Sequence, residues 1–172
     1  MGRDSLMLAD DDSVFFRVGV GAIIMDCSLD KLLLFRRSDY TGTWQCPQGG
    51  VNKNEQTDEA IFREVFEETG ILSQELKVIA VCPVWVGYEL PMTDKSSCFS
   101  KGQVHRWYVL QLLTSYDALR STESCEFIDA SWCLVEDWAS TAPDFKKDAV
   151  NFLISWLMNV KVSSDVDSKG SV

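Results

Sequence analysis

The stretch QGGVNKNEQTDEAIFREVFEETGI, residues 48–71, decides the fold. Its second half predicts a helix over 57–69, because apolar residues recur there at helical spacing. At about 100° per residue, Glu64, Glu67 and Glu68 share one side of that helix. The other side, expected to pack inward, carries Ile61, Phe62, Val65 and Phe66.

The three glutamates on one side of the helix need an explanation. Like charges at i, i+3 and i+4 destabilise an isolated helix by a few tenths of a kcal/mol per pair. A divalent cation would reverse that sign, and oxygen ligands without a nearby His or Cys favour Mg²⁺ or Mn²⁺ over zinc. The alternative interpretation is a solvated acidic face with no ligand.

The residues around the helix favour a site over a solvated face. The loop PQGGVNKN precedes the helix, and its glycines permit close approach of the backbone to a metal or a phosphate. Gly70 follows the helix where a terminating glycine is expected. Arg63 can reach back to Glu55, which would fix the loop to the helix.

The rest of the chain predicts a mixed β-sheet flanked by helices, an α/β fold. A second amphipathic helix is expected near 144–159, with a core-facing stripe made of Ala149, Val150, Phe152, Leu153, Trp156, Leu157 and Val160. Strands are expected near 18–25, 31–35, 78–88, 103–113 and 127–135.

Length and composition indicate one domain. The chain has 172 residues and is 46% hydrophobic, enough for a single core. We expect a domain over 14–160, a flexible N-terminus over 1–13 and a flexible tail over 161–172. Residues 89–102 read as a long loop, which in compact domains is often functional.

Charge and cysteine usage restrict the partners and the compartment. The formal net charge of −10 means that a polyanionic substrate must be held by local cations or metal ions. Six scattered cysteines without a C-x-x-C pair argue against a zinc site and a disulfide framework. No membrane-length apolar run or basic leader is present, so we expect a cytoplasmic protein without a membrane partner.

The spacing of the fixed residues in 48–71 resembles the Nudix box. The pattern is Gly49, five residues, Glu55, seven residues, Arg63-Glu64-Val65, one residue, Glu67-Glu68, one residue, Gly70-Ile71. The resemblance implies an α/β/α sandwich that hydrolyses a nucleoside diphosphate linked to another group. It implies Mg²⁺, with Mn²⁺ as a substitute, held by Glu64, Glu67 and Glu68 beside Gly49. Arg63, Glu64 and Glu67 would be catalytic, and Glu64 or a neighbour would take a proton from the attacking water.

Beyond the box, the chain is similar to the bacterial RNA pyrophosphohydrolase and dinucleoside polyphosphate hydrolase group, which plants share. The likeness runs from about residue 15 to 160 and includes WQCPQGGV (44–51), GQVHRWYVLQL (102–112), CEFIDASW (125–132) and PDFKKDAV (143–150). Carried over by position, the resemblance implies a further metal carboxylate, Glu126, and a substrate cleft lined by Arg17, Arg37, Gln48, Tyr88, Phe145 and Lys146.

Each carried-over residue also has an ordinary structural interpretation. Arg17 could be a surface charge at a strand end, and Glu126 could be solvent-exposed. Tyr88 and Phe145 could be core aromatics, although a ring near a phosphate site also offers a stacking platform. His105, the only histidine, has no visible partner and is not expected to be catalytic.

The expected substrates are nucleoside polyphosphate ends, either 5′-triphosphorylated RNA or dinucleoside polyphosphates, with no obligate protein partner evident. Motif likeness favours RNA, whereas the acidic chain and the charge-balanced loop 89–102 favour the dinucleotide. Cys46 stands where the group has an aromatic residue, so base recognition could differ. The alternatives are a dedicated diadenosine tetraphosphate hydrolase and a non-catalytic nucleotide-binding module.

Overall fold

A computed structural model describes residues 15–39, 42–91, 101–120 and 122–169. Its helices are α1 (Thr57–Thr69), α2 (Trp138–Thr141) and α3 (Lys147–Lys169), with 3₁₀ turns η1 (Ser73–Glu75), η3 (Val135–Asp137) and η4 (Asp144–Lys146). Its strands are β1 (Phe16–Met25), β2 (Lys31–Arg37), β3 (Trp44–Gln45), β4 (Gln48–Gly50), β5 (Leu76–Val81), β6 (Val86–Glu89), β7 (Gly102–Leu112) and β8 (Phe127–Leu134).

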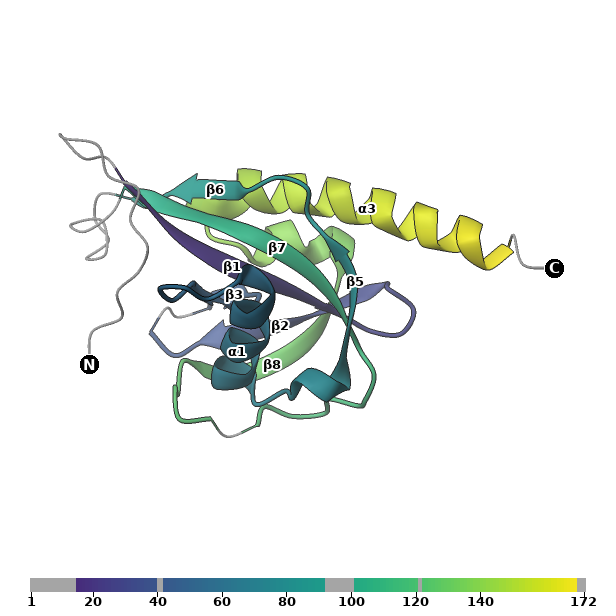
Figure 1. Cartoon of the computed structure of the whole chain (residues 1–172), viewed down its shortest axis with the longest axis horizontal. Helices are drawn as coiled ribbons and strands as arrows, with labels where there is room; N and C mark the ends of the chain where they lie inside the picture. The colour runs from purple at the N-terminus through teal and green to yellow at the C-terminus, as the bar shows by residue number, and fades with distance from the viewer. Residues whose placement is uncertain (1–14, 40–41, 92–100, 121, 170–172) are drawn as a thin grey trace.

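The strands form one mixed sheet around β1. β1 runs parallel to β7 along its whole length and antiparallel to β2 and β4. β5 and β6 pair antiparallel with β7, and β3 and β8 pair antiparallel with β2. The predicted mixed sheet with flanking helices is therefore confirmed (Figure 1).

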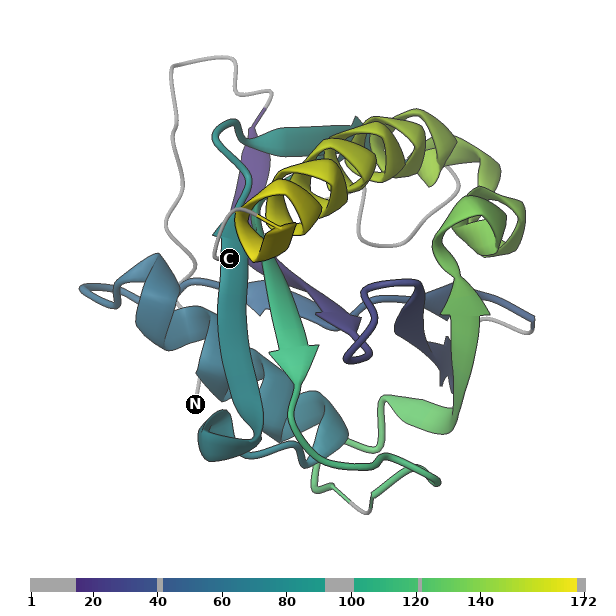
Figure 2. The ribbon, with the colours of Figure 1, turned by 90° about the vertical axis from the view of Figure 1, so that its right-hand side faces the viewer.

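Two cores lie on opposite faces of this sheet, because successive side chains of a strand point to opposite sides. Val20, Ala22 and Ile24 of β1 face the core that α1 completes, whereas Ile23 and Met25 face the core that α2 and α3 complete. Figure 2 shows α1 and α3 on either side of the sheet. The arrangement is an α/β/α sandwich.

Several elements differ from the sequence prediction. The expected strand 78–88 is divided into β5 and β6, and Pro83, which has no N–H to donate to a neighbouring strand, lies in the break. α3 continues to Lys169, well beyond residue 159, because no Gly or Pro occurs before Gly170. The predicted tail 161–172 is thus helical as far as Lys169. The helix α2 has only four residues, too few for a periodic pattern.

Two apolar positions were assigned to the wrong face. Phe66 is 51% exposed and Phe152 is 46% exposed, although both were expected to pack inward. On α1, the buried face instead includes two of the glutamates. No helix among the described ranges is both long and apolar enough to cross a membrane.

Candidate active site

The helix α1 begins and ends with local signals that fix its position. The Glu59 carboxylate accepts a hydrogen bond from the Gln56 N–H (3.2 Å), which satisfies a donor at the start of the helix. At the other end, Gly70 takes a left-handed conformation (φ 71°) and its N–H donates to the Phe66 carbonyl (2.9 Å). The thirteen helical residues between Gln56 and Gly70 therefore place the glutamates at fixed positions along the helix axis.

The acidic side of α1 is largely buried, so the interpretation as a solvated face is wrong for two of its three glutamates. Glu64 and Glu68 are only 4% and 5% exposed. Glu67 differs, because 42% of its side chain remains exposed. Removing a carboxylate from water is unfavourable unless a partner compensates, so these two residues need an explanation beyond folding.

Arg63 compensates part of this charge and ties the helix to the preceding loop. Its Nε and Nη2 donate to the two carboxylate oxygens of Glu55 (2.6 and 2.7 Å), as expected from the sequence. Nη2 also donates to the Gly50 carbonyl (2.9 Å), and Nη1 donates to Glu64 Oε1 (2.7 Å). A longer contact of 3.4 Å joins Nη1 to Glu67 Oε2. One guanidinium therefore orients Glu64 and the glycine loop together.

Gly49 lets the loop lie directly on the helix. A Cβ at this position would come 2.0 Å from the carboxylate carbon of Glu64, a distance at which no side chain fits. On the same strand, the Gln48 N–H donates to Glu68 Oε2 (3.1 Å). β4 thus covers Glu64 and Glu68 with backbone alone.

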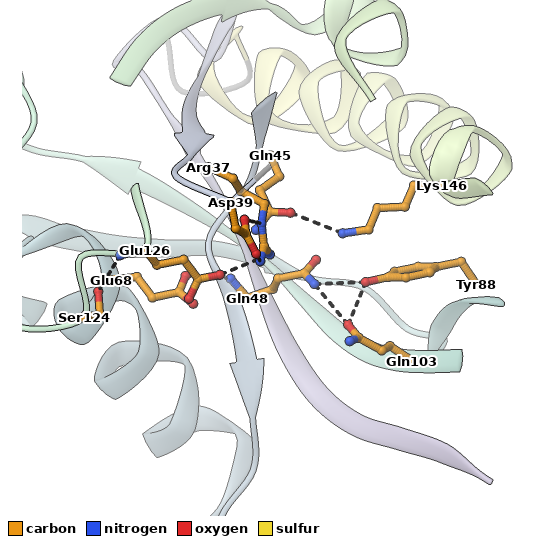
Figure 3. Close-up of polar contacts among 10 residues, drawn as sticks. All are labelled: Arg37, Asp39, Gln45, Gln48, Glu68, Tyr88, Gln103, Ser124, Glu126 and Lys146. Carbon is orange, nitrogen blue, oxygen red and sulfur yellow. Dashed lines mark hydrogen bonds and ion pairs between the residues drawn. The ribbon is translucent and has the colours of Figure 1, made fainter. Parts of the chain in front are cut away.

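A third carboxylate, Glu126, joins this pair from the start of β8. Burial raises the pKa of Glu68 well above its ordinary value, and the negative charges of Glu126 and Glu64 raise it further. Figure 3 shows Glu68 and Glu126 next to each other. Three carboxylates that repel one another suit a hard divalent cation. No three acidic, His or Cys side chains of the described ranges are gathered closely enough to hold a metal ion as they stand, so these side chains would have to turn.

The carboxylates lie at one end of a cleft of about 770 Å³. Ten of the twelve residues singled out from the sequence line it, whereas Arg63 and Glu67 do not. The ten are Arg17, Arg37, Gln48, Gly49, Glu64, Glu68, Tyr88, Glu126, Phe145 and Lys146. They come from seven elements or their ends, so only the fold unites them.

An aromatic and cationic group lies at the other end of the cleft. The Lys146 ammonium lies 4.7 Å from the centre of the Tyr88 ring and donates to Gln45 Oε1 (3.3 Å). The rings of Tyr88 and Phe145 are 5.8 Å apart. Burial and, after it, the positive charge of Arg37 lower the pKa of Lys146 to about 8. This end offers flat rings and a positive charge.

Tyr88 is fixed by hydrogen bonds to two glutamines. Its hydroxyl donates to Gln103 Oε1 (2.7 Å) and accepts from Gln48 Nε2 (3.0 Å). Figure 3 shows this triangle to the right of Glu68 and Glu126 and below Lys146. The Tyr88 ring is therefore buried and also lines the cleft. Its interpretation as a core aromatic explains the burial but not its place in the cleft.

The two arginines differ in their contacts. Arg37 is held by Asp39, through Nε (2.7 Å) and Nη2 (2.6 Å), and by Glu126, through Nη1 (3.2 Å). Arg17 is exposed at the start of β1. Among the described residues, its side chain has no hydrogen bond or ion pair.

Sequence reasoning missed several residues that line the cleft, namely Asp39, Gln45 and Gln103. Gln45 and Gln103 lie inside the quoted motifs, which was the available signal. His105 also lines the cleft, but it is buried and stacks on Tyr88 (5.9 Å). Burial lowers its pKa to about 3, so it is neutral and packs as an aromatic ring.

Comparison with known proteins places this geometry in context. The family model described as NUDIX domain matches residues 15–154. The RNA pyrophosphohydrolase of Histophilus somni (strain 2336) is 32% identical over 142 residues, which cover 77% of this chain and 71% of that protein. The E. coli dihydroneopterin triphosphate pyrophosphohydrolase superposes with a TM-score of 0.66 at 21% identity, covering 83% of this chain and 98% of that one. A C. elegans Ap4A hydrolase in a binary complex gives 0.61 at 20% identity, with the same coverage.

Proposed function

Because the chain belongs to the Nudix family of pyrophosphate-bond hydrolases, we propose that it cleaves nucleoside polyphosphate ends with a divalent metal. The proposed reaction removes pyrophosphate from 5′-triphosphorylated RNA, splits dinucleoside polyphosphates, or does both. These substrates share one chemical feature, a nucleotide base followed by several phosphates.

The observation that carries the proposal is the composition of the cleft from one end to the other. Buried carboxylates lie at one end, and the rings of Tyr88 and Phe145 lie with Lys146 at the other. A polyphosphate attached to a base matches this order, with the base on the rings and the phosphates extending towards the carboxylates. Support for RNA comes from the name of the Histophilus relative.

Nudix hydrolases generally use divalent metal ions. We propose Mg²⁺, with Mn²⁺ as a substitute, held by Glu64, Glu67, Glu68 and Glu126 after their side chains turn towards one another. The ion would neutralise charge on the phosphate oxygens and supply activated water. In the same proposal Gly49 allows close approach to the ion.

The protein's own groups account for the remaining steps. Glu64 is oriented by the 2.7 Å contact from Arg63, which suits it to take a proton from the attacking water. Arg17 and Lys146 supply local positive charge to a protein whose net charge is −10. Gln48 holds the Tyr88 hydroxyl and thereby the stacking ring.

Two other functions remain as alternatives. The acidic chain favours a dedicated diadenosine tetraphosphate hydrolase without an RNA role. The charge-balanced loop 89–102 also favoured the dinucleotide over RNA in the sequence analysis, but this loop lies mostly outside the described residues. A non-catalytic nucleotide-binding module is disfavoured by the buried Glu64 and Glu68, since a pure binder does not need two desolvated carboxylates. A cytoplasmic location belongs to the proposal as well, supported by the five free cysteines of the described residues.

The test is a comparison of kcat/KM for 5′-triphosphorylated RNA and diadenosine tetraphosphate, at fixed Mg²⁺ and moderate salt. Turnover of either substrate that is lost in Glu64→Gln, and kept in the exposed control Glu123→Gln, supports the proposal. A ratio favouring RNA would make the protein an initiator of mRNA decay, and the opposite ratio would favour the dedicated hydrolase. Binding without turnover of either substrate would favour the non-catalytic module.

A further inference from the structure

We propose that Asp39 is an internal competitor for substrate phosphate at Arg37, and that it sets the affinity of the cleft for polyphosphates. The inference rests on the proposed function, because it assumes that a phosphate group binds Arg37. Asp39 would oppose substrate binding, whereas the cleft residues named above would support it.

The contact between the two residues has the geometry of phosphate recognition. Arg37 ends β2, and Asp39 follows two residues later. Arg37 Nε donates to Asp39 Oδ1 (2.7 Å) and Nη2 donates to Oδ2 (2.6 Å), two parallel bonds from one edge of the guanidinium. A phosphate binds an arginine through the same pair of donors. A phosphate at that edge must therefore displace Asp39.

Both side chains lie where a substrate would meet them. Arg37 and Asp39 line the cleft, and Figure 3 shows them between the carboxylates and Gln45. The Arg37 side chain is 23% exposed, whereas that of Asp39 is 53% exposed. Asp39 can therefore turn into water without leaving a buried charge behind, so its displacement is inexpensive compared with that of a buried partner.

A second carboxylate contacts Arg37 independently of Asp39. Glu126 Oε1 lies 3.2 Å from Arg37 Nη1, on the other side of the guanidinium. Asp39 is thus one of two carboxylates on Arg37. The kinetic test separates a competitor from a structural partner, because loss of a structural partner would raise KM. Its removal should leave the arginine in the cleft without the Asp39 carboxylate on its Nε and Nη2 donors.

The chain supplies a matched control in the neighbouring ion pair. Arg36, the residue before Arg37, contacts Asp129 at 3.3 Å, with both side chains about half-exposed. Neither residue lines the cleft. Asp129→Asn therefore removes the same charge from the same region without touching Arg37.

The experiment compares Asp39→Asn with the unmodified protein on diadenosine tetraphosphate and 5′-triphosphorylated RNA at fixed Mg²⁺. We expect KM to fall about three- to fivefold with kcat unchanged, because a half-exposed competitor is weakly bound. Asp129→Asn should leave KM unchanged. In an Arg37→Met background, Asp39→Asn should have no effect on KM. Asp39→Ser provides a second variant if Asp39→Asn unfolds, as judged by thermal melting.

Three results would overturn the inference: an unchanged or raised KM in Asp39→Asn, an equal fall in Asp129→Asn, or an equal fall without Arg37. Failure of the proposed function is distinguishable, because the unmodified protein would then hydrolyse neither substrate. Calorimetric binding of inorganic tripolyphosphate would still test the competition in that case. Asp39→Asn should bind this probe about three- to fivefold more tightly, and equal binding would count against the inference.

Discussion

Gly49 lies directly against Glu64, so closely that a Cβ at residue 49 would come 2.0 Å from the glutamate's carboxylate carbon. Arg63 holds the same carboxylate at 2.7 Å, so Glu64 has little room to retreat. We expect Gly49→Ala to destabilise the protein by about 1–3 kcal/mol, as overpacking does, and to lower kcat about 100-fold by displacing Glu64. Urea unfolding and steady-state kinetics measure the two effects.

Gly87→Ala is the control for this change. Its nearest neighbour, the Gln103 carbonyl oxygen, would lie 3.0 Å from the new Cβ, so a small shift accommodates it. We expect this variant to keep most of the activity. Full activity in Gly49→Ala would contradict the close approach of the loop to the helix.

Glu67 should be separable from folding. Its side chain is 42% exposed, and its ion pair with Arg63 is long, at 3.4 Å. Such a contact adds little to stability. The free energy of unfolding of Glu67→Gln should therefore be within about 0.5 kcal/mol of that of the unmodified protein. Because Glu67 is a proposed metal ligand, however, the Glu67→Gln protein should lose nearly all turnover and bind Mn²⁺ more weakly in calorimetry. Full turnover with unchanged Mn²⁺ affinity would remove Glu67 from the metal site.

The sequence predicted the parts of the molecule that depend on local pattern. The helix 57–69 was found at the expected bounds, because periodic apolar residues and a terminal glycine are both local signals. The burial of Glu64 and Glu68 could not be predicted in this way, since it depends on β4 lying across the helix. The helical pattern alone suggested that Phe66 would be buried, yet it is 51% exposed.

The cleft was predicted only in part, and for a related reason. Tyr88 and Lys146 came from the order of motifs, not from any derivation of their distance in space. Gln103 was missed because its contact with Tyr88 joins two separate strands. Asp39 was missed because it follows the end of β2, where no sequence pattern marks it. Gln103 meets Tyr88 through the antiparallel register of β6 and β7, which the sequence does not specify.

Arg120 and Glu75 should stabilise the end of α1 in a pH-dependent way. Arg120 Nη1 and Nη2 donate to the two Glu75 oxygens (2.7 and 2.8 Å), and Nη1 also donates to the Gly70 carbonyl (3.1 Å). We expect Arg120→Ala to lower the free energy of unfolding by about 1 kcal/mol at pH 7. Lys77→Ala, at an exposed position, should change it by less than about 0.5 kcal/mol.

The sign of the pH effect follows from Glu75. Hydrogen bonds, first those from Arg120 and then those from the Leu72 N–H and the Thr114 hydroxyl, lower the pKa of Glu75 from 4.5 to about 2. A carboxylate with a lowered folded-state pKa contributes stability above pH 4.5, and this contribution is lost as the pH falls towards 2. The difference between Arg120→Ala and the unmodified protein should therefore shrink over that interval in urea unfolding. A constant difference would mean that the contact with Gly70 accounts for the effect.

Lys146 should make substrate affinity fall at alkaline pH. Burial and the charge of Arg37 lower its pKa from 10.5 to about 8, so the ammonium loses its proton as the pH rises through 8. A neutral amine no longer attracts phosphate, and kcat/KM, which reports the free enzyme, should decline above that pH. Lys146→Met should show a low and flat kcat/KM over the same range. Lys147→Met, which alters a lysine paired with Asp144 outside the cleft lining, should keep the decline. An equal decline in Lys146→Met would assign the titration to another group.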